Sequence, residues 1–279
     1  MTTTVQSRTA TRRRFLVCPQ TYFAVEYAIN PWMDPRRPVD AGAALRQWQG
    51  LRDTLRRLGH GVETLQPRPR LPDMVFAANG ASVVDGRVLV ARFRHPERAP
   101  EAAAHHAWFQ RAGYRPTVAR LPNEDQGDFL PVGGLVLAGS GLRTSPAAHR
   151  EAGAALGRRV VSLQLTDPRF YHLDTALAVL SEDQIMYYPA AFTPESNRTL
   201  YALFPRAILA TDQDAAVLGL NAISDGRHVL LTDAAHGLAV QLHDDGFVPV
   251  GVHLPELLKG GGGPKCRVLE LHPAPEETT

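Results

Sequence analysis

A cysteine behind a run of four glycines is the sequence feature with the clearest chemical potential. Cys266 follows Gly260–Gly263 at a short distance and stands between Lys265 and Arg267. Glycines let the backbone come close to a ligand, and neighbouring cations favour the thiolate over the thiol. Cys266 is therefore a candidate nucleophile. The alternative is a small buried residue at the start of a last strand, because residues 266–271 alternate with a period of two.

A histidine and a carboxylate two residues apart form the second candidate. His172 and Asp174 follow the aromatic pair Phe170-Tyr171. If this segment is a strand, both side chains point to the same face. Histidine titrates near neutrality, so His172 can act as a general acid and base beside a thiolate. A core histidine among aromatic residues is the alternative.

Four further polar clusters lie at expected strand ends or turns, where catalytic residues concentrate. They contain Asn30, then Asp73 and Asn79, then Arg92 and Arg94, and finally Glu124, Asp125 and Asp128. Arginines on one face of a strand end can clamp a carboxylate in bidentate fashion. Taken singly, each cluster also fits a cap, a turn or a solvated surface.

Helix-period segments alternate with short β-branched runs along the chain. Helices are expected over residues 41–58, 97–112, 146–156, 194–203 and 234–244. Asp85-Gly86 and Asp225-Gly226 separate paired strands and are strong hairpin signals, and Gly133-Gly134 and Glu182-Asp183 occupy equivalent places. A unit of hairpin, helix and extra strand thus recurs about five times, with a period of roughly 50 residues.

A ring is the most economical arrangement of five such α/β units. Its strand ends would converge on a central channel, where polar residues far apart in the sequence could meet. The alternative is an irregular α/β domain whose elements only look periodic.

Composition limits the classes of protein to consider. The chain has 279 residues, of which 44% are hydrophobic, and a net charge of +2. We expect a single catalytic domain over residues 14–273, a disordered basic tail over 1–13 and a flexible tail over 274–279. No run of ~18 apolar residues and no signal peptide is present, which predicts a cytoplasmic protein without a membrane contact. Nothing in the charge pattern indicates a nucleic-acid partner.

Two cysteines, Cys18 and Cys266, are too few for a disulfide framework or a structural zinc site. Both are expected to be reduced, although one bridge between them remains open. No metal is expected, because no cluster has ligand spacing.

Taken in order, these segments resemble the guanidino-group-modifying superfamily, which includes arginine deiminase, dimethylarginine dimethylaminohydrolase, arginine dihydrolase and the amidinotransferases. The resemblance extends from residues 15–19 to Cys266. Its most specific parts are the glycine run, the His-Leu-Asp-Thr segment at His172 and the Glu-x-x-Gly-Asp stretch at Glu124. It implies a five-bladed α/β propeller of the pentein type with one central active site, and a mechanism that needs no cofactor.

The resemblance also implies roles for individual residues. Cys266 would be the nucleophile, His172 the general acid and base, and Glu124 the carboxylate that orients it. Substrate contacts would come from Arg94 and Arg143 on an α-carboxylate, from Asp73 and Asp174 near the guanidinium, and from Asn30 and Asn79. Two positions depart from the family pattern, since Asp125 replaces a glycine and Asn79 stands where an acidic residue is common. Either Glu124 or Asp125 is then the catalytic carboxylate, and Glu124 is preferred.

The expected activity is hydrolysis of a small guanidino substrate. A guanidinium carbon is a poor electrophile, so a thiolate nucleophile and protonation of the departing amine are both required. Asp174 can accept two hydrogen bonds from unsubstituted nitrogens, and a dimethylated nitrogen would leave it unpaired at a cost of ~1–3 kcal/mol. Together with Asn79 this favours free arginine, hydrolysed once to citrulline or twice to ornithine.

Other activities remain open. Hydrolysis of dimethylarginine to citrulline and dimethylamine is the main alternative. Amidino transfer and a propeller that only binds ligands are less favoured, and the sequence leaves homo-oligomerisation open.

Overall fold

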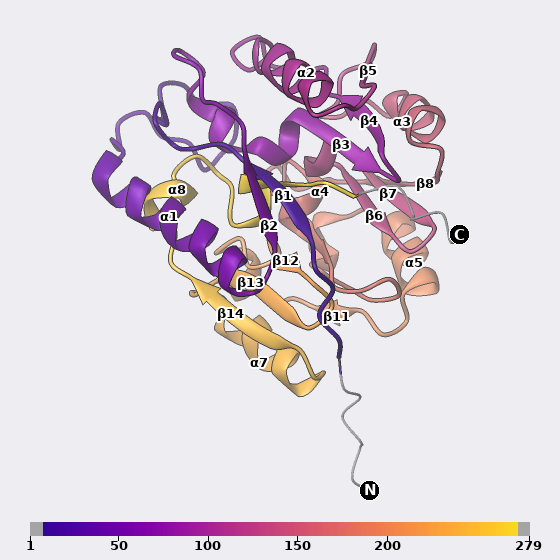
Figure 1. Cartoon of the computed structure of the whole chain (residues 1–279). Coiled ribbons are helices and arrows are strands. Elements are labelled where there is room, and N and C mark those ends of the chain that lie inside the picture. Colours follow the sequence, from indigo (N-terminus) through magenta and orange to yellow (C-terminus); the bar gives the residue numbers. More distant parts are fainter. Residues whose placement is uncertain (1–7, 273–279) are drawn as a thin grey trace, which may run out of the picture.

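A ring of five small sheets forms the protein, as Figure 1 shows for the computed structural model, which describes residues 8–272. Each sheet has three strands, and in each an antiparallel pair is extended by a parallel third strand. The five-bladed α/β propeller expected from the sequence is therefore confirmed.

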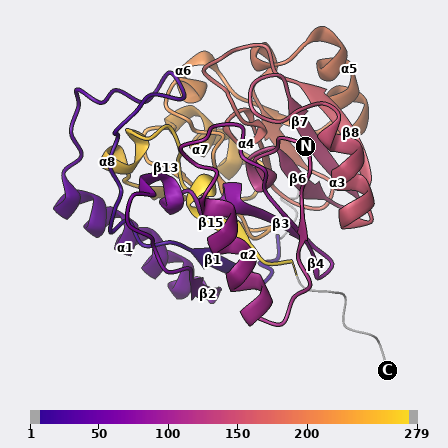
Figure 2. The same ribbon diagram turned by 90° about the horizontal axis from the view of Figure 1, so that it is seen from above.

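The two ends of the described chain meet in the first blade. Strand β1 (Arg14–Val17) pairs antiparallel with β15 (Val268–Glu270) and parallel with β2 (Gly61–Thr64). In this register Leu16 lies opposite Leu269. Figure 2 shows β1 and β15 near the middle of the molecule. The ring is thus closed by hydrogen bonds between segments about 250 residues apart, which no local signal announces.

The other four blades follow in chain order. They consist of β3 (Ala81–Val84), β4 (Arg87–Val90) and β5 (Thr117–Val118); β6 (Phe129–Val132), β7 (Leu135–Ser140) and β8 (Arg159–Gln164); β9 (Leu177–Val179), β10 (Ile185–Tyr187) and β11 (Ile208–Leu209); and β12 (Ile223–Ser224), β13 (His228–Thr232) and β14 (Val248–Val252). All four predicted hairpins are present. At the β3–β4 turn, Asp85 and Gly86 have φ values of 50° and 75°, as a two-residue hairpin loop of this type requires.

One helix in each blade connects the middle strand to its parallel neighbour. These helices are α1 (Ala41–Arg57), α2 (Glu101–Arg111), α3 (Ala148–Leu156), α5 (Pro194–Leu203) and α7 (His236–Asp244). They succeed one another around the rim of the ring in Figure 1. A parallel neighbour needs such a crossover, so the helices stand outside and the strand ends face inward. The five predicted helices are confirmed, with starts that differ by up to four residues, as α2 begins at Glu101 rather than at residue 97.

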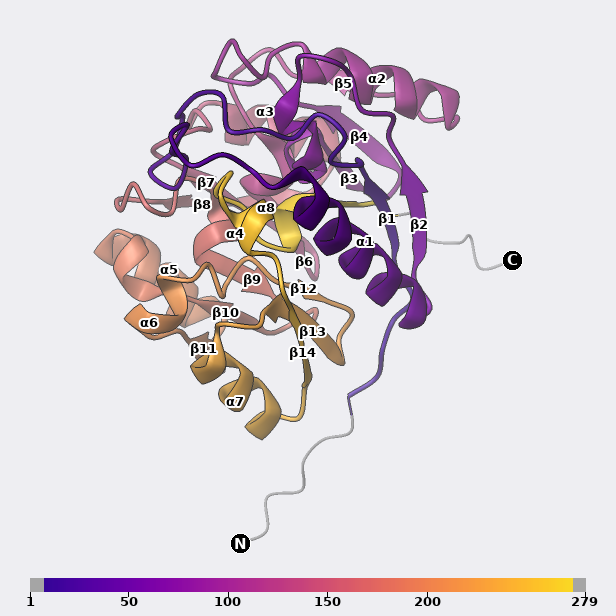
Figure 3. The ribbon, with the colours of Figure 1, turned by 90° about the vertical axis from the view of Figure 1, so that its left-hand side faces the viewer.

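Helix α1 shows how local sequence sets these elements. The Asp40 side chain accepts the N–H of Ala43 at 2.9 Å and caps the helix. Its buried face has the spacing of an amphipathic helix and consists of Ala44, Trp48, Leu51 and Leu55. The helix also packs beside α8 (Pro255–Leu258), as Figure 3 shows, and Gln47 Oε1 accepts the Glu256 N–H at 3.0 Å. This contact anchors the segment that precedes the glycine run.

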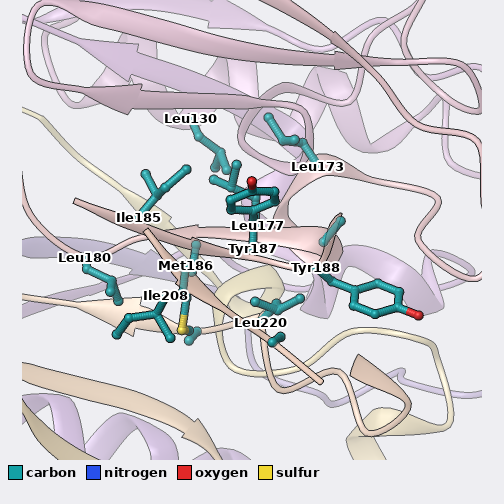
Figure 4. Close-up of a cluster of buried hydrophobic side chains, with 14 of the residues drawn as sticks. Leu130, Leu173, Leu177, Leu180, Ile185, Met186, Tyr187, Tyr188, Ile208 and Leu220 are labelled. Atoms are coloured by element: carbon teal, nitrogen blue, oxygen red, sulfur yellow. The ribbon is translucent and has the colours of Figure 1, made fainter. Parts of the chain in front are cut away.

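The largest hydrophobic cluster joins neighbouring blades. Figure 4 shows Ile185, Met186 and Tyr187 of β10 near Leu130 of β6, Leu173 of α4 (Leu173–Ala176) and Leu220, which precedes β12. Burying such a side chain contributes roughly 1.5–3 kcal/mol to stability. Because the blades share this core, their inner ends are held in fixed positions.

The segment ahead of β1 contacts the ring from Arg8 onward. The Arg8 guanidinium lies 3.4 Å from the ring centroid of Phe247 and donates to Asp245 Oδ2 at 2.7 Å. The N–H of Thr11 donates to the Asp225 carbonyl at 2.7 Å. Arg8 and Thr11 therefore contact the fifth blade, within the segment 1–13 for which a disordered tail was expected. Residues 1–7 and the tail expected over 274–279 lie outside the described residues.

None of the helices formed by residues 8–272 has the length and apolar character that crossing a bilayer requires.

Candidate active site

Cys266 lies in a single 3₁₀ turn, η5 (Lys265–Arg267), just before β15. Its thiol is buried between two polar side chains. Sγ is 3.1 Å from Asp174 Oδ2 and 3.2 Å from Asn221 Nδ2. The backbone N–H of Cys266 donates to Asn221 Oδ1 at 3.1 Å. The Asn221 side chain thus hydrogen-bonds both the backbone and the sulfur of Cys266, which gives the thiol a defined position.

The glycine run wraps closely around an aromatic side chain. A β-carbon at Gly262 would lie 2.7 Å from Cε1 of Phe76 and 2.8 Å from the Cβ of Cys266. Gly261 has φ of 90°, a backbone conformation that favours glycine, and its carbonyl accepts the Tyr171 hydroxyl at 2.8 Å. The glycines are therefore needed to pack the loop that carries the cysteine.

The side chains of Lys265 and Arg267 are engaged in contacts within the protein. Lys265 Nζ donates to Gln126 Oε1 at 3.0 Å. Arg267 is buried, donates to the Gly262 carbonyl at 2.9 Å and lies 4.1 Å from the ring centroid of Phe76. Burial, followed by the nearby Asp174 carboxylate, raises the pKa of Cys266 well above its usual value. Arg267 lowers the pKa of Cys266, as the sequence suggested, but desolvation outweighs it.

The two cysteines are free thiols, which excludes the bridge left open by the sequence. Cys18 is buried directly after β1 and belongs to a separate hydrophobic cluster from that of Cys266.

His172 is paired with Glu124. Its Nε2 lies 2.9 Å from Glu124 Oε2, and both side chains are buried. The segment is not a strand, since His172 caps α4 in an extended conformation with φ of −126° and ψ of 156°. Because Glu124 is ionised, Nε2 donates to it, and Nδ1 is left as the atom that can accept a proton. That Nδ1 is buried and has no partner.

Two arginines keep Glu124 charged. Arg143 Nη1 lies 2.9 Å from each carboxylate oxygen, and Arg98 Nη1 lies 3.5 Å from Oε2. Burial alone would favour the neutral acid, but Arg143, His172 and Arg98 together hold the pKa of Glu124 well below its usual range.

Asp125 stands in a different environment from that of its neighbour Glu124. Neither of its oxygens has a hydrogen-bond partner among the described residues, and burial raises the pKa of Asp125 well above its usual value despite the nearby Ser82. Its φ of 41° is one that glycine adopts more readily. Of the two carboxylates left open by the sequence, Glu124 is the one in contact with His172.

Two buried carboxylates each keep one oxygen without a partner. Asp174 Oδ1 is unpaired, and burial raises the pKa of Asp174 to about 6. Asp73, in η1 (Pro72–Val75), accepts the Tyr27 hydroxyl at 2.9 Å on Oδ2, while its Oδ1 is unpaired and burial raises its pKa. Buried acceptors of this kind suit a ligand rich in N–H donors.

Asn79 has an unpaired hydrogen-bond donor, where Asp174 and Asp73 have unpaired acceptors. It lies in η2 (Ala77–Gly80), and its Oδ1 accepts from Arg98 Nη1 at 2.9 Å. Its Nδ2 is buried without a partner. A β-carbon at Gly127 would lie 2.5 Å from this Nδ2 and 3.1 Å from His172 Nδ1. The two unpartnered nitrogens therefore face the same small space, which Gly127 leaves open.

The remaining predicted site residues lie around these groups. Arg94 is exposed, and its Nε donates to the Arg143 carbonyl at 3.1 Å. Arg143 is engaged with Glu124 and also donates to the Ile29 carbonyl at 2.8 Å. Asn30 is half-buried and donates to the Gly260 carbonyl at 3.2 Å. Of the two predicted substrate-binding arginines, Arg94 is exposed and Arg143 is buried, and Asn30 supports the glycine run.

Sequence reasoning missed two residues of this region. Asn221 contacts the Cys266 thiol, and Arg98 donates to Asn79. A positional signal was available for Asn221. It stands two residues before β12, just as Asn79 stands two before β3 and Cys266 two before β15. In three blades, the residue that lies two positions before one strand of the antiparallel pair is thus one of the polar groups of this site. Arg98 had no comparable signal, because most arginines are surface charges.

A cavity of about 340 Å³ lies apart from the nucleophile. It is lined in part by Gln126, Lys265 and Glu270, but not by Cys266 or His172. Within residues 8–272, no three His, Cys, Asp or Glu side chains are placed to hold a metal ion.

Comparison with known proteins places this geometry in context. The family model for arginine deiminase matches residues 52–225. The chain is 55% identical to N(G),N(G)-dimethylarginine dimethylaminohydrolase of Mycobacterium tuberculosis, over 95% of this chain and 88% of that protein. It is 35% identical to the bifunctional arginine dihydrolase/ornithine cyclodeaminase ArgZ of Synechocystis, over 92% of this chain but only 37% of that longer protein.

A solved structure is similar over nearly the whole chain. It is the N-terminal domain of ArgZ, an arginine dihydrolase, as a cysteine-to-serine variant bound to substrate. The TM-score is 0.90 at 34% identity, with 94% of this chain and 98% of that chain covered.

Proposed function

The chain belongs to the arginine deiminase family and is a C–N hydrolase of linear amidines, and from this premise we propose that its substrate is free arginine, hydrolysed twice to ornithine. The observation that carries the proposal is the Asp174 carboxylate, with Oδ2 3.1 Å from the Cys266 thiol and Oδ1 buried and unpaired. This is the place where a carboxylate can hold an unsubstituted guanidinium against the sulfur.

Binding of the substrate would activate the nucleophile. The guanidinium is rich in N–H donors and positively charged, so Asp174 and Asp73 can accept from it in the buried site. Its positive charge beside Sγ lowers the pKa of Cys266, which burial raises in the ligand-free protein. Arg94, which is exposed and donates to the Arg143 carbonyl, is suited to the α-carboxylate.

Attack by Sγ forms a C–S bond at the guanidinium carbon, and a C–N bond then breaks to release ammonia. His172, with Nδ1 unpartnered and Nε2 held by Glu124, takes the thiol proton and gives it to the departing nitrogen. Water then attacks the amidino-thioether, His172 takes its proton, and the C–S bond breaks to release citrulline. The buried negative charge of Glu124 stabilises the protonated imidazole at each transfer.

The second cycle would use citrulline as substrate. Attack at the ureido carbon releases another ammonia and leaves a thiocarbamate, whose hydrolysis gives ornithine and carbon dioxide. The overall change consumes arginine and two waters and yields ornithine, two ammonia and carbon dioxide. The neutral Asn79 supports this step, because an acidic residue there would favour the cation arginine over the neutral citrulline.

Dimethylarginine is a second candidate, which the 55% identity to a dimethylarginine dimethylaminohydrolase favours. Its dimethylated nitrogen has no N–H to offer Asp174, so one acceptor would stay unpaired. Incubation with arginine and with asymmetric dimethylarginine, followed by assay of citrulline, ornithine, ammonia and dimethylamine, separates the two. Ornithine from arginine supports the proposal. Dimethylamine release with little turnover of arginine would replace it with the second candidate.

The pH dependence of arginine hydrolysis should report Asp174. Burial raises the pKa of Asp174 to about 6, so below that pH the carboxyl is protonated and loses its attraction for the guanidinium. We expect kcat/KM for arginine to fall as the pH drops through about 6. Steady-state rates between about pH 5 and 8 measure this. An Asp174→Asn variant should be slow and lack this acid limb, and persistence of the limb there would assign it to another group.

The product should change when Asn79 becomes acidic. In an Asn79→Asp variant the carboxylate still pairs with Arg98 but attracts the cationic guanidinium and holds the neutral ureido group weakly. We expect product release to shift from ornithine toward citrulline, measured by chromatography after complete consumption of arginine. Citrulline as the sole product of the unmodified protein, with added citrulline never consumed, would contradict the second hydrolysis.

A further inference from the structure

The cavity of about 340 Å³ is a second candidate ligand site, separate from the one that holds Cys266. It is lined by parts of β6, β9 and β12 and by the turns that follow β6 and β9. Asp174 and Asn221 precede β9 and β12, so the cavity lies along these strands beyond the polar groups of the active site. We infer that it binds a small carboxylate with an aliphatic body, whose charged end pairs with Lys265.

Aliphatic side chains form much of the wall of this cavity. Pockets for small molecules typically enclose roughly 300–1,000 Å³ between mostly hydrophobic walls, with a few polar groups that orient the ligand. The wall side chains include Leu130, Leu177 and Leu180, which Figure 4 labels, and Val132, Val179 and Ile223. Gly133, Gly134 and Glu182 also line the cavity and are exposed, so its mouth lies at these two turns. Solvent there screens the charge of Glu182.

Most of the other charged groups around the cavity already have partners. Arg13 Nη1 lies 3.0 Å from Glu270 Oε1, and Arg158 Nε donates to Asp85 Oδ2 at 2.7 Å. His272 lies 3.5 Å from Glu270, and burial lowers the pKa of His272, which favours the neutral imidazole. These pairs leave Lys265 as the cation to which a ligand can offer a counter-charge.

Lys265 is held by uncharged acceptors. Within residues 8–272, its Nζ donates to Gln126 Oε1 at 3.0 Å and to the Val268 carbonyl at 3.5 Å. An ammonium group has three donors, so one remains for a ligand. Burial lowers the pKa of Lys265, although the charges of Asp174 and Glu270 oppose this, and a carboxylate beside Nζ would favour the charged form further. The cavity therefore favours an anion over a neutral or cationic ligand of the same shape.

Three six-carbon probes test this preference on the full chain. Hexanoate, hexan-1-ol and hexylammonium share one aliphatic chain and differ in their polar ends. We expect hexanoate to bind with a Kd on the order of 1 mM, measured by ligand-detected NMR titration. Hexan-1-ol should bind about 10-fold more weakly, because it cannot form a charge-assisted hydrogen bond with Lys265, and hexylammonium should bind no better than the alcohol.

Two variants locate the bound probe. Lys265→Met should weaken hexanoate by about 10-fold and hexan-1-ol by less than about 3-fold. Gly134→Phe keeps Lys265 and narrows the mouth, since a β-carbon at Gly134 would have Arg158 Nη1 as its nearest neighbour, at 3.8 Å, and its φ lies outside the left-handed region. It should weaken both probes by about 10-fold. Arg159→Met is the matched control, because Arg159 is an exposed cation that does not line the cavity, and it should change neither Kd by more than about 2-fold.

Excess arginine separates this cavity from the active site. In a Cys266→Ser chain, arginine should leave the Kd of hexanoate unchanged. Displacement of hexanoate by arginine would place the probe in the active site and overturn the inference. Equal affinity for hexanoate and hexan-1-ol, or no binding of hexanoate at about 10 mM, would also overturn it. If Lys265→Met does not fold, the probe series decides on the charge preference, and hexanoate binding that Gly134→Phe leaves unchanged refutes the location.

Discussion

Replacing Cys266 with serine is expected to reduce arginine turnover by about 10⁴-fold or more. The hydroxyl can keep the contacts with Asp174 and Asn221, so the site should stay assembled and still bind arginine. A serine hydroxyl is a much weaker nucleophile than a thiolate, and the bound cation cannot lower its pKa enough to compensate. Release of ammonia and ornithine measures the loss, and intact mass should show no adduct on the variant. Unchanged turnover would end the covalent mechanism.

Cys18→Ala is the matched control for this experiment. Cys18 is equally buried but belongs to a different hydrophobic cluster from that of Cys266. Its loss should lower the free energy of unfolding by about 1 kcal/mol and leave turnover per folded molecule unchanged. A Cys18→Ala protein that folds normally but is inactive would show that the wrong cysteine was assigned.

Replacing His172 with alanine should slow turnover by ~10²–10⁴-fold, the range for removal of a general acid and base. The variant loses the unpartnered Nδ1 that receives and returns protons, and it leaves Glu124 paired with Arg143 and Arg98. Initial rates of ammonia release measure the first chemical step. Near-normal rates would assign His172 to the core.

Intact mass analysis of the same variant locates the affected step. If an adduct accumulates on Cys266, attack still proceeds and His172 is needed chiefly to deprotonate water. Glu124→Gln is a suitable companion, because it keeps the shape beside His172 Nε2 and removes only the charge. It should be slower than the unmodified protein, whereas an activity equal to it would show that the carboxylate has no electrostatic role.

The repeat could be predicted because each blade is built from local signals. Asp85-Gly86 and the other turn pairs separate strands at short range, and the helices carry an amphipathic period. The repeat therefore predicted a ring, but not which strands close it. The antiparallel pair of β1 and β15 joins segments at opposite ends of the described chain, and no local pattern marks the two strands as partners.

The site was predictable in its residue types but not in its electrostatics. Cys266, His172 and Glu124 were named from motifs, and the structure places Glu124 against His172 and Asp174 against the thiol. Their catalytic roles stay predictions. The effect of burial on the Cys266 thiol could not be predicted, because a sequence shows which charges are adjacent along the chain but not how deeply a group is buried.

Closure of the ring by the first and last described strands has a consequence for biosynthesis. A ribosome delivers β1 first, and this strand must wait for its antiparallel partner until Val268–Glu270 have been made. The nucleophile arrives on the same segment, two residues ahead of that partner. A chain that stops before this segment therefore lacks both the strand that closes the first blade and the thiol proposed as the nucleophile.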